Sequence, residues 1–197
     1  MSLVLGLIIG GALLTMGVGT GAVLRGRRRA AQRVLPAPAP RNTVLSERGF
    51  ALELGDVIDI DKQSLWLKHA WLALEGDDAV AALLFSGQDV VVLQPGAGLR
   101  LCLTREVELS VGHEVPSALE LGGARFERVR RLPVRLLVVG DSPSPPFDEA
   151  LFSELRGLSG EVLWVLTHGG FCKAYAGRSL DAAEVEYWGG GSLTVTG

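Results

Sequence analysis

Apolar and polar residues follow two different patterns along this chain. Residues 3–24 form one uninterrupted apolar run without an ionisable side chain. The run predicts a single transmembrane α-helix, because roughly 20 apolar residues at 1.5 Å rise cross a hydrocarbon core about 30 Å thick. An arginine-rich stretch and a proline–alanine repeat follow in 25–45, and they predict a partly extended linker. We therefore expect a transmembrane anchor (1–24), a linker (25–45) and one folded domain (46–197).

Beyond residue 45 the apolar residues recur with a period of two more often than of 3.6, and turn residues interrupt them at short intervals. This pattern predicts a mainly β domain, either an antiparallel β-sandwich or a partly open barrel, with at most one short helix. The helix is expected at 148–158, where Leu151, Phe152 and Leu155 have helical spacing. The segments expected as strands are 51–60, 64–74, 80–85, 90–93, 99–103, 106–111, 118–121, 124–129, 134–139, 161–167, 171–175, 184–188 and 192–196. Of these, 134–139 is the most continuous apolar run and is expected to be buried.

Positive charge on one side of the apolar run predicts its orientation. Arg25, Arg27, Arg28 and Arg29 directly follow it, and the first acidic residue of the chain is Glu47. Because positive flanks tend to remain in the cytoplasm, we expect a single-pass cell-membrane protein with its N-terminus outside and its C-terminal domain cytoplasmic. The same arginines could also contact lipid headgroups. A cleaved signal peptide is the alternative, but its charge precedes a shorter apolar core.

Glycines form a stripe on the predicted span. Gly6, Gly10, Gly17 and Gly21 fall on one face of a helix, and each outer pair has the G-x-x-x-G spacing. Such a stripe lets two helices approach closely in lipid, which indicates self-association or a partner helix. The alternative is that glycine is simply common in membrane spans.

The charge balance of the predicted domain limits its partners. After Arg41 the chain contains 13 basic and 22 acidic residues. The six other basic residues are Arg41 itself and five arginines before it. This acidic balance argues against nucleic-acid binding, which needs a basic surface. Only two cysteines occur, Cys102 and Cys172, so no disulfide framework is expected and a reducing compartment is compatible with both thiols.

Candidate catalytic chemistry is weak throughout the sequence. Residues 136–142 end in Gly-Asp-Ser, which resembles the nucleophile block of the GDS-type lipases and esterases. That chemistry needs a histidine base and an oxyanion hole. The chain has no Asp-x-x-His, its only asparagine is Asn42, and Pro143 follows Ser142 directly. We expect Asp141 and Ser142 to lie in a loop and the protein not to be an enzyme.

The cysteines, histidines and tryptophans offer further candidate sites. Cys102, His113, His168 and Cys172 could supply four ligands, but structural zinc sites use two short-spaced pairs, so no metal or cofactor is expected. A nucleophile pair of Cys172 with His168 lacks a third orienting group. Trp66 and Trp71 would face opposite sides of one unbroken strand, so one could be in the core and the other exposed for a partner. The alternative, which is favoured, is that the tryptophans, Trp164 and Trp188 included, simply pack in the core or at its rim.

Three short motifs carry a family resemblance. They are Leu54-Gly55-Asp56-Val57-Ile58 followed by Ile60-Asp61, the acidic turn in 75–78, and Ala183-Glu184-Val185-Glu186-Tyr187-Trp188-Gly189. On these motifs the chain resembles an uncharacterised bacterial family, domain of unknown function 4178, over about residues 50–190. The segment 80–121 shows no family-like pattern. The resemblance implies a β-rich fold and no established activity or catalytic residues.

Together these patterns favour a membrane-anchored, non-catalytic interaction or scaffold module that binds a protein or another copy of itself at the cytoplasmic face. The alternative is a small-ligand or lipid-binding β domain. That alternative predicts a closed barrel with an apolar cavity. An enzyme with a dispersed site leaves no short motif, and it predicts polar groups that converge in a pocket.

Overall fold

A computed structural model of the chain describes residues 43–96, 99–112, 114–141 and 143–188. Two single-turn 3-10 helices occur in this part, η1 (Ser46–Arg48) and η2 (Ala182–Glu184). The strands are β1 (Val57–Ile60), β2 (Gln63–Trp66), β3 (His69–Glu75), β4 (Asp78–Ser86), β5 (Asp89–Gln94), β6 (Arg100–Val107), β7 (Ala118–Leu121), β8 (Ala124–Val139), β9 (Glu149–Arg156), β10 (Glu161–His168), β11 (Phe171–Leu180) and β12 (Val185–Trp188). The mainly β prediction is therefore confirmed.

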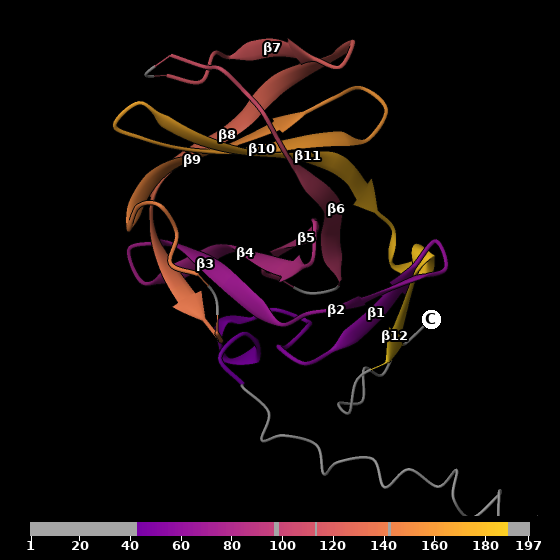
Figure 1. Cartoon of the computed structure of the whole chain (residues 1–197). Helices are drawn as coiled ribbons and strands as arrows, with labels where there is room; N and C mark the ends of the chain where they lie inside the picture. The colour runs from indigo at the N-terminus through magenta and orange to yellow at the C-terminus, as the bar shows by residue number, and fades with distance from the viewer. Residues whose placement is uncertain (1–42, 97–98, 113, 142, 189–197) are drawn as a thin grey trace, which may run out of the picture. The chain divides into compact units, whose positions relative to one another are not determined.

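Eight of the strands close an antiparallel barrel. Their order is β3–β4–β5–β6–β11–β10–β9–β8, and β8 pairs back onto β3. β7 extends this sheet beside the first part of β8, and a separate small sheet has the order β12–β1–β2 (Figure 1). The sequence predicted a sandwich or a partly open barrel, and the structure contains a closed one.

The barrel wall is covered on two outer sides, which explains why so many strands are apolar on both faces. The small sheet and the segment before it pack against the outside of β3, β4 and β5 through Ile58, Leu65 and Leu84, among others. On the other side, β7, the start of β8 and the segment around Val115 cover the outside of β9, β10 and β11 (Figure 1). Alternate residues of the same strands point into the lumen. Three apolar layers therefore stabilise the fold.

Side chains fill the barrel lumen. Trp164, Phe152 and Leu83 have no exposed surface there, and Tyr175 has 1%. The rings of Phe152 and Trp164 stack with centroids 5.2 Å apart. This lumen is thus a packed core.

The helix predicted at 148–158 is wrong, because that segment forms β9. Phe152 faces the lumen and Leu155 faces the outer layer, and both are fully buried. Glu154 lies between them and also faces the lumen, where two arginines pair with it. The charge interrupted the alternation of apolar residues, so the remaining apolar positions imitated helical spacing.

Several strand boundaries also differ from the prediction. The segment 64–74 is two strands, because Leu67 bonds through its backbone to Gly55 and Asp56 and interrupts the run. The segments 124–129 and 134–139 join in the 16-residue β8, and Arg135 and Leu137 within it are exposed. No separate strand forms at 106–111, since β6 ends at Val107. The predicted strand at 192–196 lies outside the described residues.

The barrel needs a glycine where β6 and β11 cross closely. Gly177 is paired with Thr104, and a Cβ atom built on it would lie 1.9 Å from the carbonyl oxygen of Leu103. No side chain can occupy that space, so Gly177 sets the distance between these two strands.

Candidate functional sites

The predicted anchor residues lie outside the part of the chain that the structure describes. This applies to Gly6, Gly10, Gly17 and Gly21 of the glycine stripe and to the arginines Arg25, Arg27, Arg28 and Arg29. In the described residues no helix has the length and apolar character that a membrane crossing needs. The span, the topology and the helix-packing stripe all remain predictions.

The residues weighed as metal ligands or as a thiol pair do not come together. Cys102 is buried in the lumen, whereas Cys172 packs with the outer layer over β10 and β11. His168 stacks on Phe147 with ring centroids 5.7 Å apart. His113 lies outside the described residues. Burial raises the pKa of both thiols, so neither is an activated nucleophile at neutral pH.

The Gly-Asp-Ser segment leads into the loop between β8 and β9. Asp141 is exposed there, and Ser142 lies outside the described residues. The indole N–H of Trp71 donates to the carbonyl oxygen of Pro143 at 3.2 Å and thereby ties this loop to β3. This part of the loop is thus held by a lumen tryptophan.

The tryptophans divide between core and surface. Trp71 and Trp164 are buried in the lumen, and Trp66 and Trp188 are 56% and 63% exposed. Both exposed rings flank Val57, because β1 pairs with β2 and β12 at that residue. The expected split of Trp66 and Trp71 is confirmed, although they belong to different strands.

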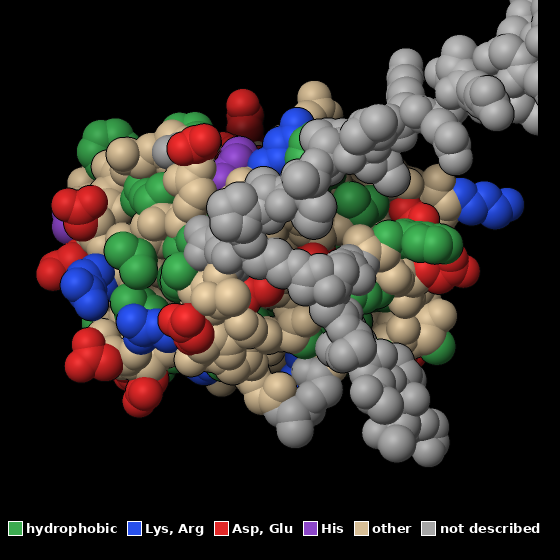
Figure 2. Space-filling view, turned by 90° about the horizontal axis from the view of Figure 1, so that it is seen from below, with side chains coloured by type: hydrophobic (Ala, Val, Ile, Leu, Met, Phe, Trp, Pro, Cys, Tyr) green, Lys and Arg blue, Asp and Glu red, His purple; other side chains and the backbone are tan. Residues whose placement is uncertain are grey.

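These exposed rings lie on the outer face of the small sheet. The Trp188 indole donates to Asp59 at 2.7 Å, and the Lys68 ammonium lies 5.0 Å from the centre of the Trp66 ring. Figure 2 shows this side of the molecule, with hydrophobic side chains among acidic ones. Local polar partners therefore hold both rings in place.

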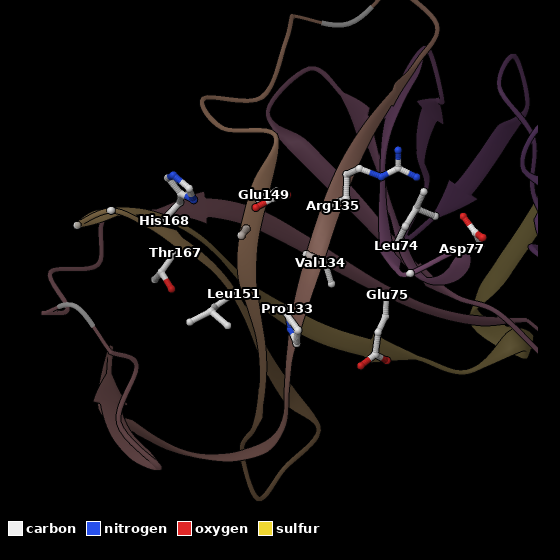
Figure 3. Close-up of a pocket in the computed structure, with 14 residues that line it drawn as sticks. Leu74, Glu75, Asp77, Pro133, Val134, Arg135, Glu149, Leu151, Thr167 and His168 are labelled. Carbon is white, nitrogen blue, oxygen red and sulfur yellow. The ribbon is translucent and has the colours of Figure 1, made fainter.

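An open hollow of about 730 Å³ lies at one end of the barrel. One wall is the β3–β4 turn, with Glu75 and Asp77, and the opposite wall is the β10–β11 turn, with His168 (Figure 3). Strands β8 and β9 form the floor between the walls. The apolar floor residues are Leu74, Pro133, Val134, Ala150 and Leu151.

Strand pairing fixes the floor of this hollow. Arg135 is paired with Leu74 on one side and with Glu149 on the other. In the next row, Leu151 is paired with both Pro133 and Thr167. The floor is thus part of the barrel wall, and the hydrogen bonds between β3, β8, β9 and β10 hold it in place.

The rim of the hollow is predominantly acidic. Glu75, Asp77 and Glu149 are exposed there, and Arg135 is the one arginine of the lining. Arg48 approaches from η1 and donates to the backbone carbonyl of Asp77 at 2.7 Å, which fixes the β3–β4 turn. Beside the other wall, Phe171 is 71% exposed. The hollow therefore offers apolar contact area bordered by carboxylates.

The hollow contains no paired nucleophile and base among its described lining residues. Thr167 and His168 are neighbours on β10 and point to opposite sides, as Figure 3 shows. A serine or cysteine is absent from the described lining.

A second site is a charged cluster in the lumen at the other end of β9. Glu154 is 4% exposed and accepts from Arg156 Nε at 2.8 Å and Nη2 at 2.6 Å. Arg130 Nη2 lies 3.3 Å from its other oxygen, and Gln94 donates to that oxygen at 3.2 Å. Two guanidinium groups therefore share one carboxylate.

A pocket of about 360 Å³ opens beside this cluster, between the ends of β5, β9 and β11 and the start of β6. Arg156 Nη1 donates to Ser179 Oγ at 3.1 Å, and Ser179 Oγ lies 3.6 Å from Cys102 Sγ. Burial raises the pKa of the Cys102 thiol, although the Ser179 hydroxyl, Arg156 and the indole N–H of Trp164 act in the opposite direction. The thiol is thus neutral at physiological pH.

The sequence did not reveal either site. Glu75 and Asp77 are in a turn that could be predicted, and Glu149 and His168 are far away along the chain. Their proximity follows from the pairing of β8 with both β3 and β9. For the lumen cluster, the signal was present as a glutamate inside an apolar strand.

Comparisons of this chain with protein-family models, with curated proteins and with solved structures find no match. The resemblance to the family named above therefore stays a prediction.

Proposed function

We propose that this protein is a membrane-anchored, non-catalytic interaction module whose β domain binds a basic, partly apolar segment of a partner protein. Residues 1–24 would anchor it, and the domain would work at the cytoplasmic face. The observation that carries the proposal is the open hollow with an apolar floor and an acidic rim. Carboxylates at the rim select cationic side chains, and the floor supplies apolar contact area.

The shape of the hollow favours a polypeptide over an enclosed small molecule. It lies between two turns and is open to solvent, so a chain segment can enter and leave at both ends (Figure 3). A lipid- or ligand-binding barrel would need an apolar cavity inside, and here Trp164, Phe152 and other side chains occupy the lumen. This packing supports the interaction module over the alternative of a ligand-binding barrel.

The test measures binding of a designed peptide to the full-length protein in a non-ionic detergent. The probe is a fluorescein-labelled peptide of alternating leucine and lysine, and its counterpart has glutamate in place of lysine. We expect fluorescence polarisation to rise only with the lysine peptide. Reversing two rim charges, Glu75→Lys with Glu149→Lys, removes two attractions and adds two repulsions, each about 0.5 kcal/mol, so affinity should fall roughly tenfold or more.

The matched control is Glu108→Lys with Glu120→Lys, which changes the net charge equally at exposed positions away from the hollow. If this control weakens binding as much as the rim variant, the attraction is only that of an acidic protein for a basic peptide, and the proposed site is wrong. Equal binding of both peptides would contradict it as well.

The anchoring part of the proposal is tested separately. A reporter active only in the cytoplasm and another active only outside would each be fused to Gly197. Cytoplasmic signal supports the proposed orientation. Signal from outside would overturn it and would make Cys102 and Cys172 available to an oxidising compartment.

A further inference from the structure

The pocket beside the lumen cluster has an excess of positive charge in an otherwise acidic domain. Arg100 and Arg156 line it, and Arg130 shares Glu154 with Arg156. Two guanidinium groups therefore share one buried carboxylate, and Arg100 adds a third positive charge to the lining. A second carboxylate, that of Asp181, also lies in the lining, so the arginines exceed the carboxylates here by one.

Hydrogen-bond donors remain in excess at the same place. Beside the pocket, Arg130 Nε is buried without a hydrogen bond, and Arg130 Nη2 has only its ion-pair contact with Glu154 at 3.3 Å. Among the described residues, Arg100 of the lining has no ion pair. A buried donor without an acceptor destabilises the folded protein, and a bound anion would supply that acceptor. Gln94 and Ser179 add two polar side chains to the lining. The lining therefore offers hydrogen-bond donors and positive charge, which are the features that an anion-binding site needs.

From this excess of charge and donors we infer that the pocket bounded by Gln94, Arg100, Arg156 and Ser179 binds a small phosphate monoester or similar oxyanion. Arg100 has no ion pair, so it can pair with phosphate oxygens through two parallel N–H groups. Arg156, whose Nε and Nη2 contact Glu154, adds positive charge to the same pocket. The volume of about 360 Å³ admits a phosphate with a short substituent. This site lies at the opposite end of β9 from the hollow and does not depend on peptide binding there.

The experiment titrates the full-length protein in detergent with inorganic phosphate while chloride keeps the ionic strength constant, and thermal unfolding is followed. A specific site predicts a saturable rise in Tm, because a ligand that binds only the folded state stabilises it by mass action. Phosphate also stabilises proteins through exclusion from their surface, and that effect increases without saturation and is common to all variants.

The variant Arg100→Gln separates the two effects. Arg100 is exposed, so its loss leaves the fold intact, whereas loss of Arg156 would leave Glu154 without its closest partner. We expect Arg100→Gln to weaken phosphate affinity roughly tenfold, the equivalent of one charge-assisted hydrogen bond. The matched control is Arg125→Gln, an exposed arginine whose carboxylate contact is 3.5 Å long, and it should bind as the wild type does. A rise in Tm without saturation, or equal curves for the two variants, would overturn the inference.

Further measurements distinguish the source of the phosphate. Glycerol phosphate should compete with inorganic phosphate if the ligand is a free metabolite. If it is a lipid headgroup, protein in phosphatidylcholine nanodiscs should lose its response to added phosphate once phosphatidic acid is included. Either pattern supports the oxyanion site, and the absence of both kinds of competition would contradict it.

Discussion

The charged cluster in the lumen gives the sharpest test of how this fold is stabilised. Glu154 is surrounded by Arg130, Arg156 and Gln94 and is 4% exposed. The substitution Glu154→Gln keeps the shape of the side chain and removes the charge. Both guanidinium groups then remain in the barrel without a counter-charge.

Removing one partner of a buried ion pair typically costs about 3–5 kcal/mol of stability. Arg130 and Arg156 keep 32% and 36% of their side-chain surface exposed, so water screens part of the loss. We therefore expect the low end, about 3 kcal/mol, which corresponds to a fall in Tm of about 6–12 °C for a protein of this size.

Chemical denaturation of the full-length protein measures this free energy. The control Glu120→Gln removes an exposed carboxylate from β7 and should change stability by less than about 0.5 kcal/mol. The triple variant Arg130→Met, Glu154→Leu, Arg156→Met replaces all three charges with apolar groups and should recover most of the loss. If Glu154→Gln costs less than about 1 kcal/mol, the two arginines do not depend on Glu154, and the reasoning fails.

Three further predictions concern other parts of the barrel. Gly177→Ala should destabilise the protein by about 3 kcal/mol or more, because its Cβ would collide with Leu103, whereas Gly112→Ala meets no atom within 4 Å and should be nearly neutral; urea denaturation compares the two. Burial and the charge of Lys68 lower the pKa of His69 below its ordinary 6.5, so the unfolded chain binds this proton more readily than the folded one. The free energy of unfolding should thus decline as the pH falls below about 6.5, and it should decline less in the His69→Gln variant. Equal pH profiles of the wild type and the variant would refute this. Burial raises the pKa of Cys102, so the thiol of the Cys172→Ser variant should react with a thiol reagent at pH 8 only after unfolding, and rapid reaction of the native protein would contradict its burial.

The sequence predicted the strands better than it predicted how they are arranged. Alternation of apolar residues located β4, β5, β10 and the first half of β11, because local turn residues bound them. Closure of the barrel depends on β3 pairing with β8, two segments more than 60 residues apart along the chain, and no local pattern encodes that choice.

The two sites were unpredictable for related reasons. Each gathers side chains from four or more strands, and the residue types are ordinary surface charges in the sequence. The helix expected at 148–158 shows the same difficulty locally. A charge in the lumen is rare in a core, so Glu154 breaks the alternation of apolar residues that would have indicated a strand.

The pairing of β1 with β12 has a consequence for folding during synthesis. Val57 of β1 is paired with Trp188 of β12, so the small sheet cannot be completed until the ribosome has synthesised nearly the whole domain. Ile58 and Ile60 of β1 must wait with one strand edge open, and such edges can pair with other chains. Because the first and the last strand of the domain pair in one sheet, the small sheet is completed only when β12 is in place. A nascent chain stalled on the ribosome before β12 should therefore contain a barrel whose outer layer is incomplete. Once β12 has been synthesised, the fluorescence of Trp188 would report the completion of the small sheet.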